Sequence, residues 1–164
     1  MKVLIIGLNK ERLSYFEFVK PLEEQLINKG YKVFYMNYRS FIFLKNKRDF
    51  LKNFCLVILS GTALKDYNYL YFWRYFLVLK HLRKKTFGIC AGAQILALIS
   101  KIKILKLKKK IIGQYYIKNK KRFFLSSFLF LINNKKAYSF KIGKFKGVAY
   151  HPEVYEELVE EIHF

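Results

Sequence analysis

Two short motifs contain the residue types that cysteine-dependent acyl transfer needs. Residues 88–94 read Gly-Ile-Cys-Ala-Gly-Ala-Gln, and residues 151–153 read His-Pro-Glu. A nucleophilic cysteine needs a base within hydrogen-bond reach, and that base needs a third group to hold its tautomer and orientation. The residue types therefore favour Cys90 as the nucleophile, His151 as the base and Glu153 as the orienting carboxylate.

Cys90 lies where a buried-strand pattern meets an apolar helical run. Gly88 and Gly92 permit the sharp strand-to-helix turn that the nucleophile elbow of hydrolases requires. The positive end of a helix favours a thiolate, and its free amides can hold a developing oxyanion. The alternative for Cys90 is an inert buried cysteine, which is how we interpret Cys55, because Cys55 lacks a glycine turn and a nearby histidine.

His151 is the best candidate base among the three histidines of the chain. His81 lies in the lysine-rich end of a predicted helix, and His163 is the penultimate residue. His151 follows a predicted strand and precedes Pro152, which restricts the backbone there. The alternative is a surface turn in which His151 and Glu153 are ordinary solvated groups.

Alternating apolar patterns in the first hundred residues predict an α/β fold. Strands are expected over residues 2–6, 31–36, 55–59 and 86–89, and helices over residues 15–28, 69–85 and 95–99. Such a pattern is typical of a flavodoxin-like or Rossmann-like three-layer sandwich, with helices on both faces of a mainly parallel sheet. Ligands of such sheets bind at the carboxyl ends of the strands.

Helix boundaries in the first segment are predicted from Ser14 and Glu17, which have capping-box spacing, and from Gly30, which suits a left-handed C-cap. Pro21 should delay or kink that helix. Residues 110–115, 122–125, 135–140 and 147–150 predict strands and hairpins of a small antiparallel C-terminal region. A short helix over residues 154–162 should follow.

Composition indicates one domain spanning residues 1–164, since 164 residues with 53% hydrophobic content can form a single core. Two distant cysteines without a C-x-x-C pair indicate a reducing cytoplasm. The N-terminal apolar run is too short for a signal peptide, and no apolar run reaches the roughly 18 residues of a membrane span. The spacing of residues predicts no metal site, and because there is no glycine-rich phosphate loop we expect no ATP-binding segment.

The formal net charge of +21, from 32 Lys and Arg against 11 Asp and Glu, raises the question of a polyanionic partner. Lysine is accompanied throughout by Ile, Phe, Tyr, Asn and Leu, the pattern of AT-rich coding. We therefore favour compositional drift over nucleic-acid binding, which stays the alternative, and expect no membrane partner.

Three motifs together resemble those of class I glutamine amidotransferases. They are Gly-Ile-Cys-Ala-Gly-Ala-Gln around Cys90, Tyr-His-Pro-Glu around His151, and Leu-Ser-Gly-Thr at residues 59–62. They occur in family order within a resemblance that runs from about residue 3 to 154. Many members have histidine where this chain has Ala93, and a second glycine where it has Thr62, which leaves the pathway open.

The resemblance implies a glutaminase that uses no cofactor. Cys90 would attack the carboxamide of L-glutamine and form a γ-glutamyl thioester, with His151 oriented by Glu153. The implied oxyanion hole consists of Gly61, Thr62 and Ala91, and the implied substrate-binding residue is Gln94. The ammonia would go to a separate synthase subunit, for which GMP synthase is one candidate.

Two other functions are compatible with the same residues. The chain could be a free-standing γ-glutamyl hydrolase that needs no partner. It could also be a catalytically lapsed homologue whose basic surface serves as a binding module.

Overall fold

The structure is a computed structural model that describes residues 1–155 and 157–163. Its core is a six-stranded sheet. Its order is β2-β1-β3-β4-β9-β8, and the strands run parallel except β8, which pairs antiparallel with β9. Its strands are β1 (Lys2–Gly7), β2 (Lys32–Asn37), β3 (Leu56–Leu59), β4 (Lys85–Ile89), β8 (Ser139–Ile142) and β9 (Phe145–Val148). The four strands predicted in the first hundred residues are confirmed.

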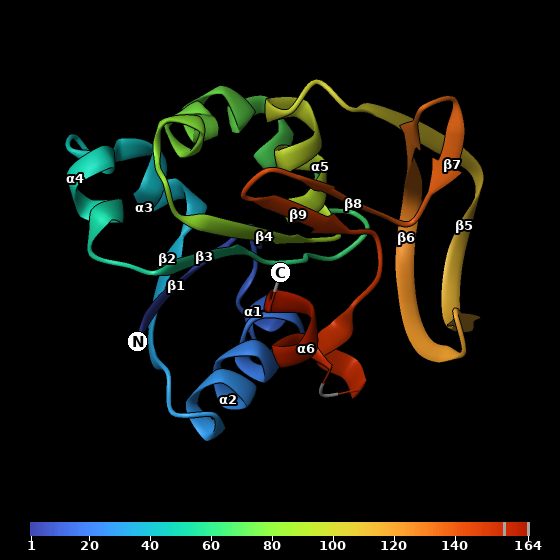
Figure 1. Ribbon diagram of the computed structural model, residues 1–164, viewed down its shortest axis with the longest axis horizontal. Coiled ribbons are helices and arrows are strands. Elements are labelled where there is room, and N and C mark those ends of the chain that lie inside the picture. The colour runs from blue at the N-terminus through green and yellow to red at the C-terminus, as the bar shows by residue number, and fades with distance from the viewer. Residues whose placement is uncertain (156, 164) are drawn as a thin grey trace.

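Helices cover both faces of this sheet, as Figure 1 shows. One face carries α1 (Arg12–Phe18), α2 (Lys20–Asn28) and α6 (Leu158–Ile162). The other carries α3 (Tyr38–Phe43), α4 (Lys47–Lys52), the 3₁₀ helix η1 (Asn68–His81) and α5 (Ala91–Ile99). A second 3₁₀ helix, η2 (Pro152–Tyr155), follows β9. The predicted flavodoxin-like three-layer architecture is confirmed.

The first predicted helix is divided in two at Val19, which lies between α1 and α2. Pro21 sits in the first turn of α2, where a missing amide costs no intrahelical bond, so the expected disruption is confirmed. The predicted capping box is wrong, because α1 begins early enough to bury Ser14 within it and Glu11 occupies the N-cap. Gly30 has φ +79°, as its predicted role after the helix requires.

A second, antiparallel sheet follows α5 and consists of β5 (Lys103–Ile117), β6 (Lys120–Ile132) and β7 (Lys135–Ala137). The strands predicted at residues 110–115 and 122–125 are parts of β5 and β6, and the segment 135–140 falls on β7 and β8. The segment 147–150 was wrongly placed in the antiparallel region, because it overlaps β9, which pairs parallel with β4 in the central sheet. The pairing of β5 with β6 shifts register between Lys106 and Ile111. Lys118 and Asn119, at φ 49° and 62°, form a hairpin turn whose twist suits the strands.

The central strands β1, β3 and β4 are buried along almost their whole length, as expected for parallel strands covered on both faces. Because these strands and β9 run parallel to one another, their carboxyl ends lie at the same edge of the sheet. In the part of the chain that the structure describes, no helix is long and apolar enough to cross a membrane.

Candidate active site

Cys90 forms the sharp turn between β4 and α5. Its backbone has φ 45° and ψ −101°, a conformation that costs a side-chain-bearing residue about 1–3 kcal/mol. The amide of Cys90 donates to Val148 O at 2.8 Å, and Cys90 O accepts from Gln94 N at 3.1 Å. The sulfur is thus held at the N-terminus of α5 by a hydrogen bond on each side of the turn.

The two flanking glycines let α5 approach the sheet. A Cβ on Gly92 would lie 2.1 Å from Leu59 O, and one on Gly88 would lie 2.6 Å from the carbonyl carbon of Gly92. The amide of Gly92 donates to Ser60 O at 3.1 Å. Close backbone contact therefore requires glycine at both positions, at Gly92 against Leu59 of β3 and at Gly88 against α5, as the sequence predicted.

His151 and Glu153 lie just beyond the carboxyl end of β9, which pairs with β4. Nδ1 of His151 is 2.8 Å from Oε1 of Glu153, and the two residues are only 1% and 4% exposed. The amide of His151 donates to Phe123 O on β6 at 2.8 Å. The imidazole and its carboxylate thus form a buried pair at the same sheet edge as Cys90.

The surroundings of the imidazole favour its protonated form. Burial alone lowers the pKa of His151, but the Glu153 carboxylate and the nearby Cys90 thiol raise it to about 10. Because Glu153 occupies Nδ1, Nε2 is the ring nitrogen left for Cys90. Within residues 1–155 and 157–163 no hydrogen bond to the buried Nε2 is found, and the Cys90 thiol donates to Leu125 O at 3.3 Å.

The other residues predicted for the site lie beside Cys90 or beside His151. Thr62, Ala91 and Gln94 line one small cavity with Cys90. Gly61 packs against the imidazole so closely that a Cβ there would lie 2.6 Å from Cε1 of His151. Every predicted site residue is therefore found at one edge of the sheet.

Cys55 lies at the opposite edge, at the start of β3, where its thiol donates to Lys2 O at 3.1 Å. Both cysteines are unpaired. Among the described residues, no group of three or more His, Cys, Asp or Glu side chains is arranged to hold a metal ion.

Comparison with known proteins supports the architecture. No protein-family model matches the sequence, and no curated protein does. A Thermoplasma acidophilum structure assigned to GMP synthase, as one of its subunits, is 14% identical, with a TM-score of 0.76 over 99% of this chain and 92% of that one. A glutamine amidotransferase from Thermotoga maritima is 20% identical, with a TM-score of 0.64 over 93% and 76%. One from Methylobacillus flagellatus is 12% identical, with a TM-score of 0.63 over 93% and 70%.

This chain has the glutamine amidotransferase fold. In that fold its cavity beside Cys90 includes residues that the sequence did not indicate: Tyr69 from η1, and Ser127 and Phe128 from β6. Tyr69 is 2% exposed, and burial, with a smaller effect of Cys90, raises its pKa well above the usual value. In the sequence, the apolar residues around Tyr69 indicated packing in the core. No motif in the sequence indicated that residues 125–128 lie near Cys90.

The cavity beside Cys90 is very small in this structure. The cavity beside Cys90 measures about 10 Å³, roughly the room of one water molecule. Tyr69 and the β6 segment 125–128 cover it, and Cys90 is 4% exposed. The cavity in this structure therefore has no room for a substrate beside the sulfur.

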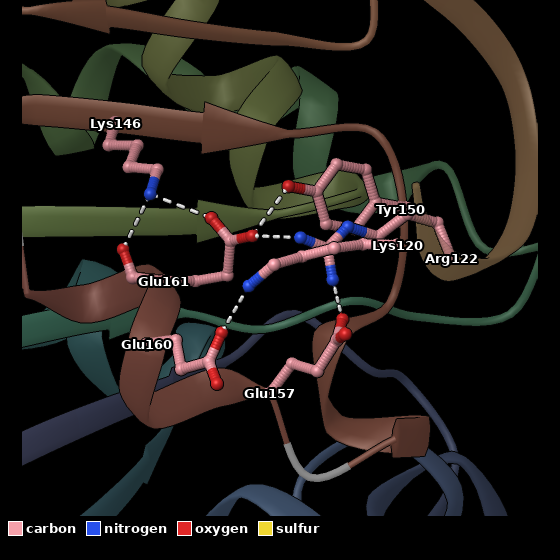
Figure 2. Close-up of polar contacts among 7 residues, drawn as sticks. All are labelled: Lys120, Arg122, Lys146, Tyr150, Glu157, Glu160 and Glu161. Atoms are coloured by element: carbon pink, nitrogen blue, oxygen red, sulfur yellow. Dashed lines mark hydrogen bonds and ion pairs between the residues drawn. The ribbon is translucent and has the colours of Figure 1, made fainter. Parts of the chain in front are cut away.

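A network of ion pairs and hydrogen bonds includes Tyr150, the residue before His151 (Figure 2). Arg122 forms ion pairs with Glu157 and Glu161, the latter at 2.8 Å. Tyr150 donates to Glu161 at 2.8 Å, and Lys146 pairs with Glu161 at 2.7 Å. Tyr150 directly precedes His151, and Arg122 directly precedes the residue whose carbonyl binds the amide of His151. The network therefore connects β6 and α6 to the imidazole.

Proposed function

We propose that this chain is a glutaminase that hydrolyses L-glutamine to glutamate and ammonia through Cys90, His151 and Glu153. One observation supports this most strongly: a cysteine in a strained strand-to-helix turn and a buried His–Glu pair meet at the carboxyl ends of two neighbouring strands. Residues 1–164 act as one amidotransferase domain in this proposal.

The first half-reaction transfers the γ-glutamyl group to the enzyme. In the reactive form the thiol proton lies on His151, in agreement with its raised pKa, and the thiolate Sγ of Cys90 bonds to the carboxamide carbon of glutamine. The resulting oxyanion accepts hydrogen bonds from the amide of Ala91 and an amide at Gly61 or Thr62. When the C–N bond breaks, His151 returns the proton to the leaving nitrogen, so ammonia departs and a thioester remains.

The second half-reaction restores the Cys90 thiolate and the protonated ring of His151. His151 removes a proton from water, whose oxygen attacks the thioester carbonyl, and the C–S bond then breaks to release glutamate. The carboxylate of Glu153 keeps Nδ1 protonated and stabilises the imidazolium formed in each half. The raised pKa of His151 agrees with a ring that readily holds the transferred proton.

Glutamine enters once the cover over Cys90 opens. Small-molecule sites typically occupy about 300 Å³ or more, whereas the closed cavity measures about 10 Å³. We therefore expect weak glutaminase activity from the chain alone. Gln94 lines the cavity and is proposed to contact the substrate once it has opened.

A separate synthase subunit is the proposed recipient of the ammonia and the factor that opens the site. The Thermoplasma acidophilum structure is assigned to GMP synthase, which makes that enzyme one candidate. Two unpaired cysteines fit a reducing cytoplasm, where we place the protein. The proposed reaction uses no cofactor.

The decisive experiment incubates the protein with a diazo-ketone analogue of glutamine and locates the adduct by peptide mass. Modification of Cys90, together with glutamate release that Cys90→Ala abolishes and Cys55→Ala retains, is the expected result. An adduct on Cys55, or no adduct after long incubation, would refute the triad. Faster turnover of γ-glutamyl peptides than of glutamine would indicate the free-standing hydrolase instead.

A further inference from the structure

Positive charge is concentrated in one long stretch of this chain. Residues 67–152 contain 20 of the 32 Lys and Arg residues and none of the 11 Asp and Glu residues. Nine of these basic residues lie within residues 103–122, which form β5, the hairpin turn and the start of β6. We call residues 103–122 the basic arm.

The basic arm lies in the second sheet, beside the central one (Figure 1). Its strand β5 is an edge strand, and the exposed Lys108, Lys109 and Lys110 lie where the register shifts between Lys106 and Ile111. Lysines and bulges also protect edge strands from aggregation. Edge protection accounts for the lysines, but not for the aromatic groove beside them.

That groove has a volume of about 490 Å³ and includes the rings of Tyr115, Phe124 and Tyr138. Phe124 is buried, with its ring centre 5.6 Å from Tyr115 and 5.3 Å from Tyr138. Tyr116, which also lines the groove, is 70% exposed. The lysines that line it are Lys109, Lys110 and Lys118.

Exposed tyrosines beside lysines are the combination that single-stranded nucleic acids bind, with bases stacked on rings and phosphates next to ammonium groups. Protein interfaces are depleted in lysine, whereas nucleic-acid interfaces are strongly positive. We propose that the basic arm binds single-stranded nucleic acid, with a base stacked on Tyr116 and the phosphates along Lys108–Lys110. This binding is independent of the glutaminase activity proposed above.

Fluorescence anisotropy of the full chain with a labelled oligouridylate of about twelve nucleotides tests the stacking contact. Tyr116→Ala should weaken binding by about 5- to 150-fold without changing its dependence on salt. Tyr71→Ala, at an 83% exposed tyrosine outside the arm, is the matched control and should bind as the unmodified chain does. Equal affinity of both variants would overturn the proposal.

A salt series tests the phosphate contacts. Replacing Lys108, Lys109 and Lys110 with glutamine should reduce the slope of log affinity against log salt by about 2. The control replaces the exposed lysines Lys2, Lys29 and Lys32, which lie on other elements, and should leave the slope unchanged. Equal slopes for the two triple variants would show diffuse attraction. Displacement of oligouridylate by polyglutamate of equal charge would point to an acidic protein surface; either result overturns the proposal.

Discussion

Cys90 and His151 lie at the ends of neighbouring strands, but different kinds of contact hold the two residues. Around Cys90 the contacts are backbone ones: amide hydrogen bonds to Val148 and Gln94, and close packing of Gly92 on Leu59. Next to His151 the contacts include side chains from distant elements: Tyr150, the residue before it, shares the α6 carboxylate of Glu161 with Arg122 of β6.

This difference separates the geometry of the nucleophile from that of the base. The turn at Cys90 follows from β4, α5 and the glycines between them, so it should form whenever the central sheet forms. The placement of His151 also needs β6 and α6 to dock correctly. We therefore expect the imidazole half to be the more easily disturbed, and four predictions test this contrast.

The largest effect is expected from removing the nucleophile. Cys90→Ala should lower glutaminase turnover by about 10⁴-fold or more, because no other group can form the thioester. Its stability should change little, since the turn depends on the backbone. Turnover is measured by glutamate release and stability by urea unfolding. Substantial residual turnover would contradict covalent catalysis by Cys90.

Replacing Arg122, the cation shared by Glu157 and Glu161, should disturb the region around His151. Arg122→Met leaves Glu157 and Glu161 with less compensation in a largely buried position, where side chains are 8–19% exposed, so we expect a loss of about 3–5 kcal/mol in unfolding free energy. Loosening of β6 should also speed alkylation of Cys90. Urea unfolding and timed iodoacetamide labelling measure the two effects.

The control for Arg122 is Lys120→Met, which removes an ion pair with Glu160 whose partners are 51% and 65% exposed. Solvent-exposed pairs contribute about 0–1 kcal/mol, so this variant should be close to the unmodified chain. If the two variants lose the same small amount, the network does not hold β6 and α6 together.

A smaller loss is expected from crowding the nucleophile half. In Gly92→Ala the new Cβ would lie 2.1 Å from Leu59 O, so α5 must shift, at a cost of about 1–3 kcal/mol. Gly30→Ala is the comparison, because Gly30 has open space around it and φ +79°, so only its backbone resists the change. Both variants should lose a similar amount of unfolding free energy, but only Gly92→Ala should react more slowly with the diazo-ketone. That result would place the structural change at the turn around Cys90.

The last prediction concerns the pH dependence of stability, whose effect at any single pH step is small. The folded pKa of His151, about 10, lies above its usual 6.5, so the folded chain keeps a proton that the unfolded chain has lost between these values. The stability that this proton provides is complete below about pH 6.5 and disappears as pH rises toward 10, at most about 1.4 kcal/mol per pH unit.

Glu153→Gln tests that dependence. It removes the main group that raises the pKa of His151, so burial should lower the pKa and the loss of stability between pH 6.5 and 10 should shrink or disappear. Urea midpoints across this range measure it. His81→Gln, at an exposed histidine outside the site, should leave the profile as it was. An unchanged profile in Glu153→Gln would show that the carboxylate does not govern the ring.

Much of the fold was predictable because its signals are local. An apolar run that ends at Gly7 indicated β1, and the pattern around Cys90 indicated β4 and the strand-to-helix turn that follows it. The helices α3 and α4 were missed, since each is only six residues long and mixes basic with aromatic residues. The hairpin of β5 and β6 was predicted in fragments, because lysines interrupt the alternation of β5.

Local residue patterns were enough to predict the turn at Cys90 and the pairing of His151 with Glu153, because each depends on residues a few positions apart. The groups that surround them come from distant parts of the chain. The Cys90 thiol donates a hydrogen bond to the carbonyl of Leu125, 35 residues away. The side-chain amide of Gln25 donates to the carbonyl of Glu153, 128 residues away. Such contacts depend on how whole elements pack, and local residue patterns do not specify that packing.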